Sequence, residues 1–239
     1  MQINRFNTGF TLLEMAVVLL IVGLLLSGLL PTLSAQAEQQ RIADTRKQMN
    51  EIRDALLGFA VSKGRLPCPA DGTIASNNLA GAEWVVGSGV AQVCGSNRGV
   101  LPWVSLGVPE TDAWGRRYSY RITATFADGE DGTGGSCALS SGVSFQLCSL
   151  GNLTVYKASG GAKVSDYLPA VVVSHGANGR GAYSTMGSVI GGASGDESEN
   201  TDNNNSFVSR EFSTNFDDLV LWISPNILFN RIVSAGKAP

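Results

Sequence analysis

The sequence predicts an α+β fold, in which a long N-terminal helix is followed by a small antiparallel sheet with long loops. Three observations support this prediction. The run from Phe10 to Leu30 is apolar apart from one charged residue, Glu14. Apolar residues then recur three and four positions apart as far as Phe59, as they do on one face of a helix. Beyond Lys63 the chain is rich in glycine and contains short alternating segments, which are typical of turns and strands.

The apolar run is long enough to span a bilayer. At a rise of ~1.5 Å per residue, a helix over residues 10–30 is ~30 Å long, which is the hydrocarbon thickness of a typical membrane. We therefore expect residues 1–9 to be a leader peptide and residues 10–30 to form a transmembrane and assembly helix. The leader contains one basic residue, Arg5, and the next is Arg41, which predicts a cytoplasmic N-terminus.

Glu14 is the residue of this run that requires an explanation. A carboxylate inside the hydrocarbon region is costly, so we expect Glu14 to be functional. Cleavage after Gly9 would create a new α-amino group on Phe10. Pairing of that amine with Glu14 of a neighbouring subunit would cancel two charges and fix the axial offset between subunits. The alternative is a simple N-terminal anchor whose Glu14 lies at the membrane interface.

The segment Gly9-Phe10-Thr11-Leu12-Leu13-Glu14, with the apolar helix behind it, resembles the class III signal of type IV pilins and type II secretion pseudopilins. The resemblance implies cleavage after Gly9 by prepilin peptidase, N-methylation of Phe10 and a role of Glu14 in filament assembly. Pro31 lies where many members of that family carry a helix-bending proline. The implied partners are other pilin or pseudopilin subunits, prepilin peptidase and an inner-membrane assembly platform. The implied location is the inner membrane in a single pass, with a periplasmic head, and a filament after assembly.

Residues 31–63 are predicted to continue the helix as an amphipathic segment. Pro31 is expected to bend the helix rather than end it, and Gly64 is expected to be its C-cap. Two interpretations of the apolar stripe remain open: it is the face on which the head packs, or it is a coiled-coil seam with other subunits. The stripe consists of Ile42, Thr45, Met49, Ile52, Leu56 and Phe59.

Residues 64–239 are predicted to form a loop-rich, pilin-like globular head. The pattern Asp112-x-Trp114-Gly115-x-x-Tyr118-x-Tyr120 is similar to one in major pseudopilins, where it enters the first strand of the sheet. An aromatic hairpin without relation to that family is the alternative. Residues 191–206 are polar and acidic, and we expect them to form a mobile or metal-ordered loop. Predicted strands lie at residues 83–86, 118–122, 143–147, 153–156, 169–173 and 217–223, and an amphipathic stretch lies at residues 227–233.

The four cysteines all lie in the predicted head. An even count in a domain that the topology places outside the cytoplasm favours disulfides over free thiols. Four cysteines allow three pairings, and the sequence does not choose among them. Nearest-neighbour pairs would each contribute ~3 kcal/mol in the chain-entropy model. The candidates are Cys68, Cys94, Cys137 and Cys148.

Acidic residues in the C-terminal part are candidate calcium ligands. Calcium takes six to eight oxygen ligands, and carboxylates are prominent among them. Major pseudopilins, which the chain resembles, bind calcium just before their final strand, although the loop here is longer and does not match theirs residue by residue. The other interpretation is a solvated acidic loop that keeps a filament surface soluble, in which case no cofactor is needed. The candidate ligands are Asp196, Glu197, Glu199, Asp202, Asp217 and Asp218.

The sequence argues against catalysis and against nucleic-acid binding. The formal net charge is −3, and the basic residues are scattered rather than clustered. His175 is the only histidine, so a Ser-His-Asp triad would have to use it, and no Gly-x-Ser-x-Gly elbow supports a nucleophile. Ser174 is adjacent to His175 in the chain, which is not the geometry of a triad.

We therefore interpret the chain as a filament-forming subunit of a type IV pilus or a type II secretion system, and not as an enzyme. Its large head with irregular loops favours a minor pilin or minor pseudopilin over the bulk subunit. The alternative is a membrane-anchored periplasmic binding or adhesin-like protein that does not polymerise.

Overall fold

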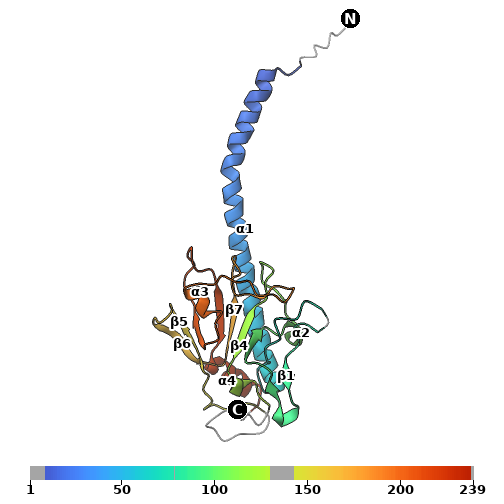
Figure 1. The fold of residues 1–239 in the computed structure, drawn as a ribbon, viewed down its shortest axis with the longest axis vertical. Helices are drawn as coiled ribbons and strands as arrows, with labels where there is room; N and C mark the ends of the chain where they lie inside the picture. The colour runs from blue at the N-terminus through green and yellow to red at the C-terminus, as the bar shows by residue number, and fades with distance from the viewer. Residues whose placement is uncertain (1–8, 78, 130–142, 238–239) are drawn as a thin grey trace. The chain divides into compact units, whose positions relative to one another are not determined.

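The computed structural model describes residues 9–77, 79–129 and 143–237, with backbone alone for residues 25–33 and 90. The chain divides into two compact units, Met1–Ala43 and Asp44–Pro239. The predicted α+β class is confirmed, since an N-terminal helix is followed by sheets whose strands are mainly antiparallel (Figure 1).

The N-terminal helix α1 (Leu12–Lys63) continues through Pro31, as predicted. The side chain of Pro31 and residues 1–8 of the predicted leader lie outside the described part of the chain. The helix ends where Gly64 adopts a left-handed conformation, with a φ of 73°, and donates its amide hydrogen to the carbonyl of Ala60 at 2.8 Å. Gly64 is therefore the predicted C-cap.

Within the described residues, no helix is at once long and apolar enough to cross a membrane.

In the second unit, the apolar stripe of α1 faces the core of the head. Two hydrogen bonds also tie this face to the segment that leads into the sheet. Thr45 Oγ1 accepts a hydrogen bond from the amide of Ala113 at 3.3 Å, and Gln48 Oε1 accepts one from the hydroxyl of Tyr118 at 2.7 Å. The stripe is therefore a packing face in this unit, which confirms the first of the two interpretations. Its buried members are Thr45, Met49, Ile52 and Leu56.

The central sheet has four antiparallel strands in the order β3-β4-β7-β9. Because side chains alternate across a strand, Tyr120 and Val172 pack toward α1 and the C-terminal helix α4 (Pro225–Ser234), whereas Val171 and Val173 pack on the opposite face. Three predicted strands and the amphipathic stretch are confirmed with small shifts of their ends. The confirmed strands are β4 (Ser119–Ile122), β7 (Ala170–Ser174) and β9 (Leu219–Ile223), whereas the edge strand β3 (Arg98–Val100) was not predicted.

A second sheet of three strands, in the order β6-β5-β8, packs on the outer face of the first. Its central strand β5 (Leu153–Tyr156) was predicted, whereas β6 (Lys163–Leu168) and β8 (Ser206–Val208) were not. Strand β8 runs parallel to β5, so this sheet is mixed rather than antiparallel. The remaining elements are a hairpin of β1 (Val85–Val86) and β2 (Val93–Cys94), the short helices α2 (Trp103–Leu106) and α3 (Asp196–Glu199), and the 3₁₀ turns η1 (Gly89–Ala91) and η2 (Ala124–Phe126).

The predicted strand at residues 143–147 is wrong, because this segment is a loop. Its alternation reflects burial of Val143 and Phe145 in the core. The Phe145 ring lies 5.1 Å from that of Phe126 and 5.8 Å from that of Phe229, measured between centroids. A loop that inserts two apolar side chains into a core produces the same period-two pattern as a strand.

The segment 191–206 is not a simple loop, because it contains α3 and leads into β8. Short-range hydrogen bonds hold it: the amide of Asn204 donates to Asp202 at 3.0 Å, and the amide of Ser206 donates to Asn204 at 2.6 Å. Asp and Asn side chains commonly stabilise turns in this way.

The Asp112-x-Trp114-Gly115 pattern forms the tight turn before β4. One Asp112 oxygen accepts hydrogen bonds from the amides of Trp114 and Arg116, both at 3.0 Å, and Gly115 has a φ of 78°. The second oxygen accepts from the Ser174 hydroxyl at 2.7 Å, which joins the turn to the end of β7. Asp and Gly are therefore structural residues in this motif.

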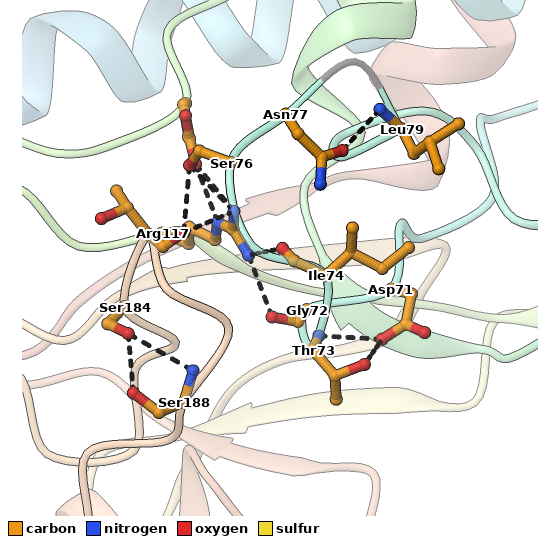
Figure 2. Close-up of polar contacts among 12 residues, drawn as sticks. Asp71, Gly72, Thr73, Ile74, Ser76, Asn77, Leu79, Arg117, Ser184 and Ser188 are labelled. Atoms are coloured by element: carbon orange, nitrogen blue, oxygen red, sulfur yellow. Dashed lines mark hydrogen bonds and ion pairs between the residues drawn. The ribbon is translucent and has the colours of Figure 1, made fainter.

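Arg117 connects several loops of the head and is fully buried. It donates to the carbonyls of Gly72 at 2.9 Å and Ile74 at 2.7 Å, and to the hydroxyl of Ser76 at 3.2 Å (Figure 2). Its charge is balanced by Glu110, with an N–O separation of 2.9 Å. The guanidinium thus supplies hydrogen bonds to loop carbonyls that the sheets do not pair.

A disulfide joins Cys68 to Cys94. This pair is one of the two nearest-neighbour pairs considered from the sequence. With a sequence separation of 26 residues, it contributes about 3–4 kcal/mol in the chain-entropy model. Cys137 lies outside the described residues, so its pairing with Cys148 stays a prediction.

Candidate functional site

The first turn of α1 is a capping box formed by Thr11 and Glu14. The amide of Glu14 donates to Thr11 Oγ1 at 3.2 Å, while Glu14 Oε2 accepts from the Thr11 amide at 2.9 Å and from its hydroxyl at 3.0 Å. These reciprocal bonds satisfy donors that the start of a helix leaves without partners. The Thr-x-x-Glu spacing signals this arrangement in the sequence. The capping box is therefore a role of Glu14 that the sequence analysis missed, beside the expected pairing with a neighbouring subunit.

Gly9 and Phe10 precede the helix and are exposed, the Phe10 side chain by 84%. A Cβ atom added at Gly9 would meet no atom within 4 Å. The fold of the described chain therefore does not require glycine at this position. Cleavage after Gly9 would leave both members of the capping box on the mature chain.

A second candidate site lies in the head, where Glu197 of α3 meets Asp217 and Asp218, which directly precede β9. One carboxylate oxygen of each residue lies within 4.8 Å of the other two. Glu197 and Asp218 are buried, and Asp217 is partly buried. One oxygen of each carboxylate has no hydrogen-bond partner among the described residues. The structure thus gathers three of the six predicted calcium ligands.

Side-chain and backbone amides position these carboxylates. Asn178 donates its backbone amide to Asp217 Oδ2 at 2.8 Å and its side-chain amide to Glu197 Oε1 at 2.7 Å. Asn200 donates its side-chain amide to Asp218 Oδ2 at 2.8 Å. These hydrogen bonds hold each acid through one oxygen, and the other oxygen accepts no hydrogen bond from the described residues.

Burial and mutual repulsion dominate the electrostatics of this cluster. Burial raises the pKa of Asp218 to about 8; the charges of Glu197 and Asp217 add to the rise, and the hydrogen bond from Asn200 opposes it. Burial also raises the pKa of Asp217. The site can be neutralised by a proton or by a cation, and an all-oxygen donor set suits calcium. Arg180, at 3.9 Å from Glu197, is 47% exposed and offsets the charge only weakly.

The other three predicted ligands lie outside this cluster. Asp196 forms an ion pair with Arg210 at 2.7 Å. Glu199 accepts a hydrogen bond from the Ser159 hydroxyl at 2.8 Å, and Asp202 accepts from Asn204. These residues stabilise the loop around α3 rather than complete the cluster.

His175 adjoins the cluster through Asp218. It is fully buried, with Nε2 2.8 Å from Ser119 Oγ and Nδ1 3.8 Å from Asp218 Oδ1. The order Ser119–His175–Asp218 is that of a triad, but 3.8 Å is too long for a hydrogen bond. Burial lowers the pKa of His175 to about 4, which makes it a weak base. That the protein is not an enzyme stays a prediction.

Comparison with protein families addresses the N-terminal segment. Residues 4–30 match the model of the prokaryotic N-terminal methylation motif. The chain carries this methylation motif. The motif is the hallmark of type IV pilins and pseudopilins, so the recognition based on Gly9–Glu14 is confirmed. Comparison with curated proteins and with solved structures found no match.

The methylation motif supports a pilin-like or pseudopilin precursor in general. It includes Gly9, Phe10 and Glu14 and ends one residue before Pro31. The motif does not include the residues of the carboxylate cluster, so the cluster is identified as a candidate site by its geometry alone.

The carboxylate cluster predicts that, without divalent cations, the stability of the head falls as the pH rises from 6.5 to 8. In this range the folded Asp218, with its pKa near 8, retains a proton that the unfolded side chain, with a value of 3.8, has lost. The expected loss is on the order of 1–2 kcal/mol. The lowered pKa of His175 acts in the opposite direction, but this contribution fades above pH 6.5, so Asp218 dominates the upper range. Urea unfolding of the full chain in detergent with EDTA, followed by tryptophan fluorescence, measures this slope.

Asp218→Asn is expected to remove the slope, whereas Asp166→Asn, at a partly exposed acid of β6, is the matched control and should preserve it. Calcium is expected to offset the loss at pH 8 in the wild type and to have no such effect on Asp218→Asn. A slope that persists in Asp218→Asn would show that another group causes it. A wild type that does not respond to calcium would leave protonation as the means of neutralising the cluster.

Proposed function

We propose that this protein is a filament-forming pilin or pseudopilin subunit of the minor class, with a pilin-like fold. In this proposal it is cleaved after Gly9 and assembles through α1 in a type IV pilus or a type II secretion system. The observation that supports it most is the methylation motif, which runs directly into a long helix. The proposed partners are other subunits, prepilin peptidase and an inner-membrane assembly platform.

The position of the cleavage site supports processing. Gly9 and Phe10 are exposed and lie before the first residue of α1, so a peptidase can reach them without unwinding the helix. Because the fold leaves open space at Gly9, the need for glycine there would come from the peptidase.

The exposed apolar side chains of the first unit support membrane insertion and assembly. Leu12 is 93% exposed, and Leu19 and Leu24 are each 67% exposed. Contiguous exposed apolar surface of this kind marks contact with lipid or with other chains. We propose that lipid covers these side chains in the precursor and that neighbouring helices cover them in the filament.

The Cys68–Cys94 disulfide supports a head on the periplasmic side, since disulfides persist in oxidising compartments. The second sheet and the long connections of the head favour a minor subunit over a bulk subunit. A membrane-anchored binding protein that does not polymerise remains the rival function, and it shares the anchor but not the requirement for cleavage and assembly.

Mass spectrometry of the N-terminus in cells with and without prepilin peptidase tests the proposal. We expect a mature chain that begins at N-methylated Phe10, and an intact leader when the peptidase is absent. Gly9→Leu is expected to block processing in the presence of the peptidase without unfolding the head, because the added side chain meets open space. An intact Met1 in wild-type cells, or a cut beyond Leu30, would overturn the proposed processing.

A further inference from the structure

The face of the four-stranded sheet that points away from α1 bears a cleft of about 400 Å³. Strands β4 and β7 form its floor, and the segment 181–193 and Phe207 of β8 contribute to its walls. This volume is typical of sites that bind small molecules. The three acids of the carboxylate cluster do not line it.

Two arginines line this cleft from directly opposite positions on neighbouring strands. Arg98 of β3 pairs in register with Arg121 of β4, and like charges in such a pair repel. Arg98 is exposed, but Arg121 is only 9% exposed. A pair that breaks a local rule of sheet pairing in this way is expected at functional sites.

Arg121 lacks a matching anion among the described residues. It donates to the carbonyl oxygen of Asn204, and its Nε has no hydrogen-bond partner in the described part of the chain. Asp202 also lines the cleft, but its carboxylate accepts from the Asn204 amide at 3.0 Å and from the Asn204 side chain at 2.7 Å. Burial, and next the charge of Arg98, lower the pKa of Arg121, and the charge of Asp202 opposes this fall without reversing it.

We propose that this cleft binds a small ligand that carries a carboxylate on an apolar body. The guanidinium fork of Arg121 matches a carboxylate, and Arg98 adds a second positive charge at the rim. Val171, Val173 and Phe207 offer an apolar surface for the rest of the ligand. Because a buried guanidinium that forms no ion pair and has an unsatisfied Nε–H is costly, a bound anion is expected to stabilise the head. This site is independent of cleavage and filament assembly.

Sodium benzoate, a carboxylate on an apolar ring, is a direct probe of the cleft. We would titrate the full chain in detergent micelles, with ¹⁵N-labelled arginine, and follow the Nε–Hε resonances by NMR. Benzoate is expected to shift the Arg121 resonance in a saturable way, and benzamide, the neutral analogue, is expected to leave it unchanged. Inorganic phosphate is expected to bind about tenfold more weakly, because it offers no apolar body. Absence of a saturable shift with benzoate, or equal binding of phosphate or benzamide, would overturn the proposal.

Variants test whether the two arginines hold the carboxylate. Followed through the Arg98 Nε–Hε resonance, Arg121→Gln is expected to raise the Kd for benzoate about tenfold or more, and Arg121→Lys, which keeps the charge without the fork, to raise it less. Since Arg121 is buried, Arg98→Gln provides a second test at an exposed position, with a smaller increase and an unchanged melting temperature. Arg231→Gln, on the exposed side of α4, is the matched control and should bind as the wild type does. Wild-type affinity in both Arg98→Gln and Arg121→Gln would exclude this site.

Discussion

Glu14→Leu is expected to reduce incorporation into filaments by about 100-fold while the membrane-bound pool of the protein is kept. In the proposed filament, the Glu14 carboxylate pairs with the Phe10 amine of a neighbouring subunit in an environment of low dielectric constant. Removing one partner leaves the other charge buried and uncompensated, which is strongly unfavourable. Leucine fits the apolar run, so membrane insertion should not suffer. Immunoblots of sheared filaments and of the membrane fraction measure the two pools.

The capping box provides the control for this experiment. Thr11→Ala removes the side-chain cap but keeps the Glu14 carboxylate, and loss of a cap costs only ~1 kcal/mol. We therefore expect Thr11→Ala to reduce assembly far less than Glu14→Leu. Equal defects in the two variants would mean that Glu14 acts mainly as part of the helix cap. Normal assembly of Glu14→Leu would show that assembly does not depend on the Glu14 carboxylate, whereas absence of the wild-type protein from sheared filaments would favour the anchored protein that does not polymerise.

Arg117→Met is expected to destabilise the head by about 3–5 kcal/mol. Methionine fills a similar volume but supplies no hydrogen bonds to the carbonyls of Gly72 and Ile74, and it leaves Glu110 without its cation. Loss of donors to buried acceptors and removal of the buried cation of a partly buried ion pair are among the most destabilising single changes. Urea unfolding of the full chain at fixed pH measures the change in the free energy of unfolding.

Arg117→Lys separates charge from hydrogen bonding at this position. Lysine keeps the positive charge beside Glu110 but cannot reproduce the planar set of donors, so an intermediate loss is expected. Arg53→Gln, on the α1 surface, should change stability by no more than about 0.5 kcal/mol. A loss below ~1 kcal/mol in Arg117→Met would show that the loops around it are held mainly by other contacts.

Features that are encoded by residues close together in the sequence were predictable. The helix over residues 12–63, its end at Gly64 and the methylation segment are encoded by contiguous patterns of period, capping and composition. Strands β4, β7 and β9 were also found from alternation or buried runs. The same signal failed at residues 143–147, where a loop buries Val143 and Phe145. An alternating apolar pattern shows only that every second side chain is buried. A strand also requires backbone hydrogen bonds to a neighbouring strand, and the pattern does not report these.

The sequence by itself determined the N-terminal segment, the α+β class and the acidic residues from which a cation site could be built. Tertiary structure alone decided that Glu197 meets Asp217 and Asp218, that His175 contacts Ser119, and that Arg98 faces Arg121. It also placed β8 parallel to β5. These pairings join residues far apart in the chain, and they depend on strand register and on the packing of two sheets. A shift of one residue in register would turn Arg121 from the cleft to the core, and no local pattern specifies that register.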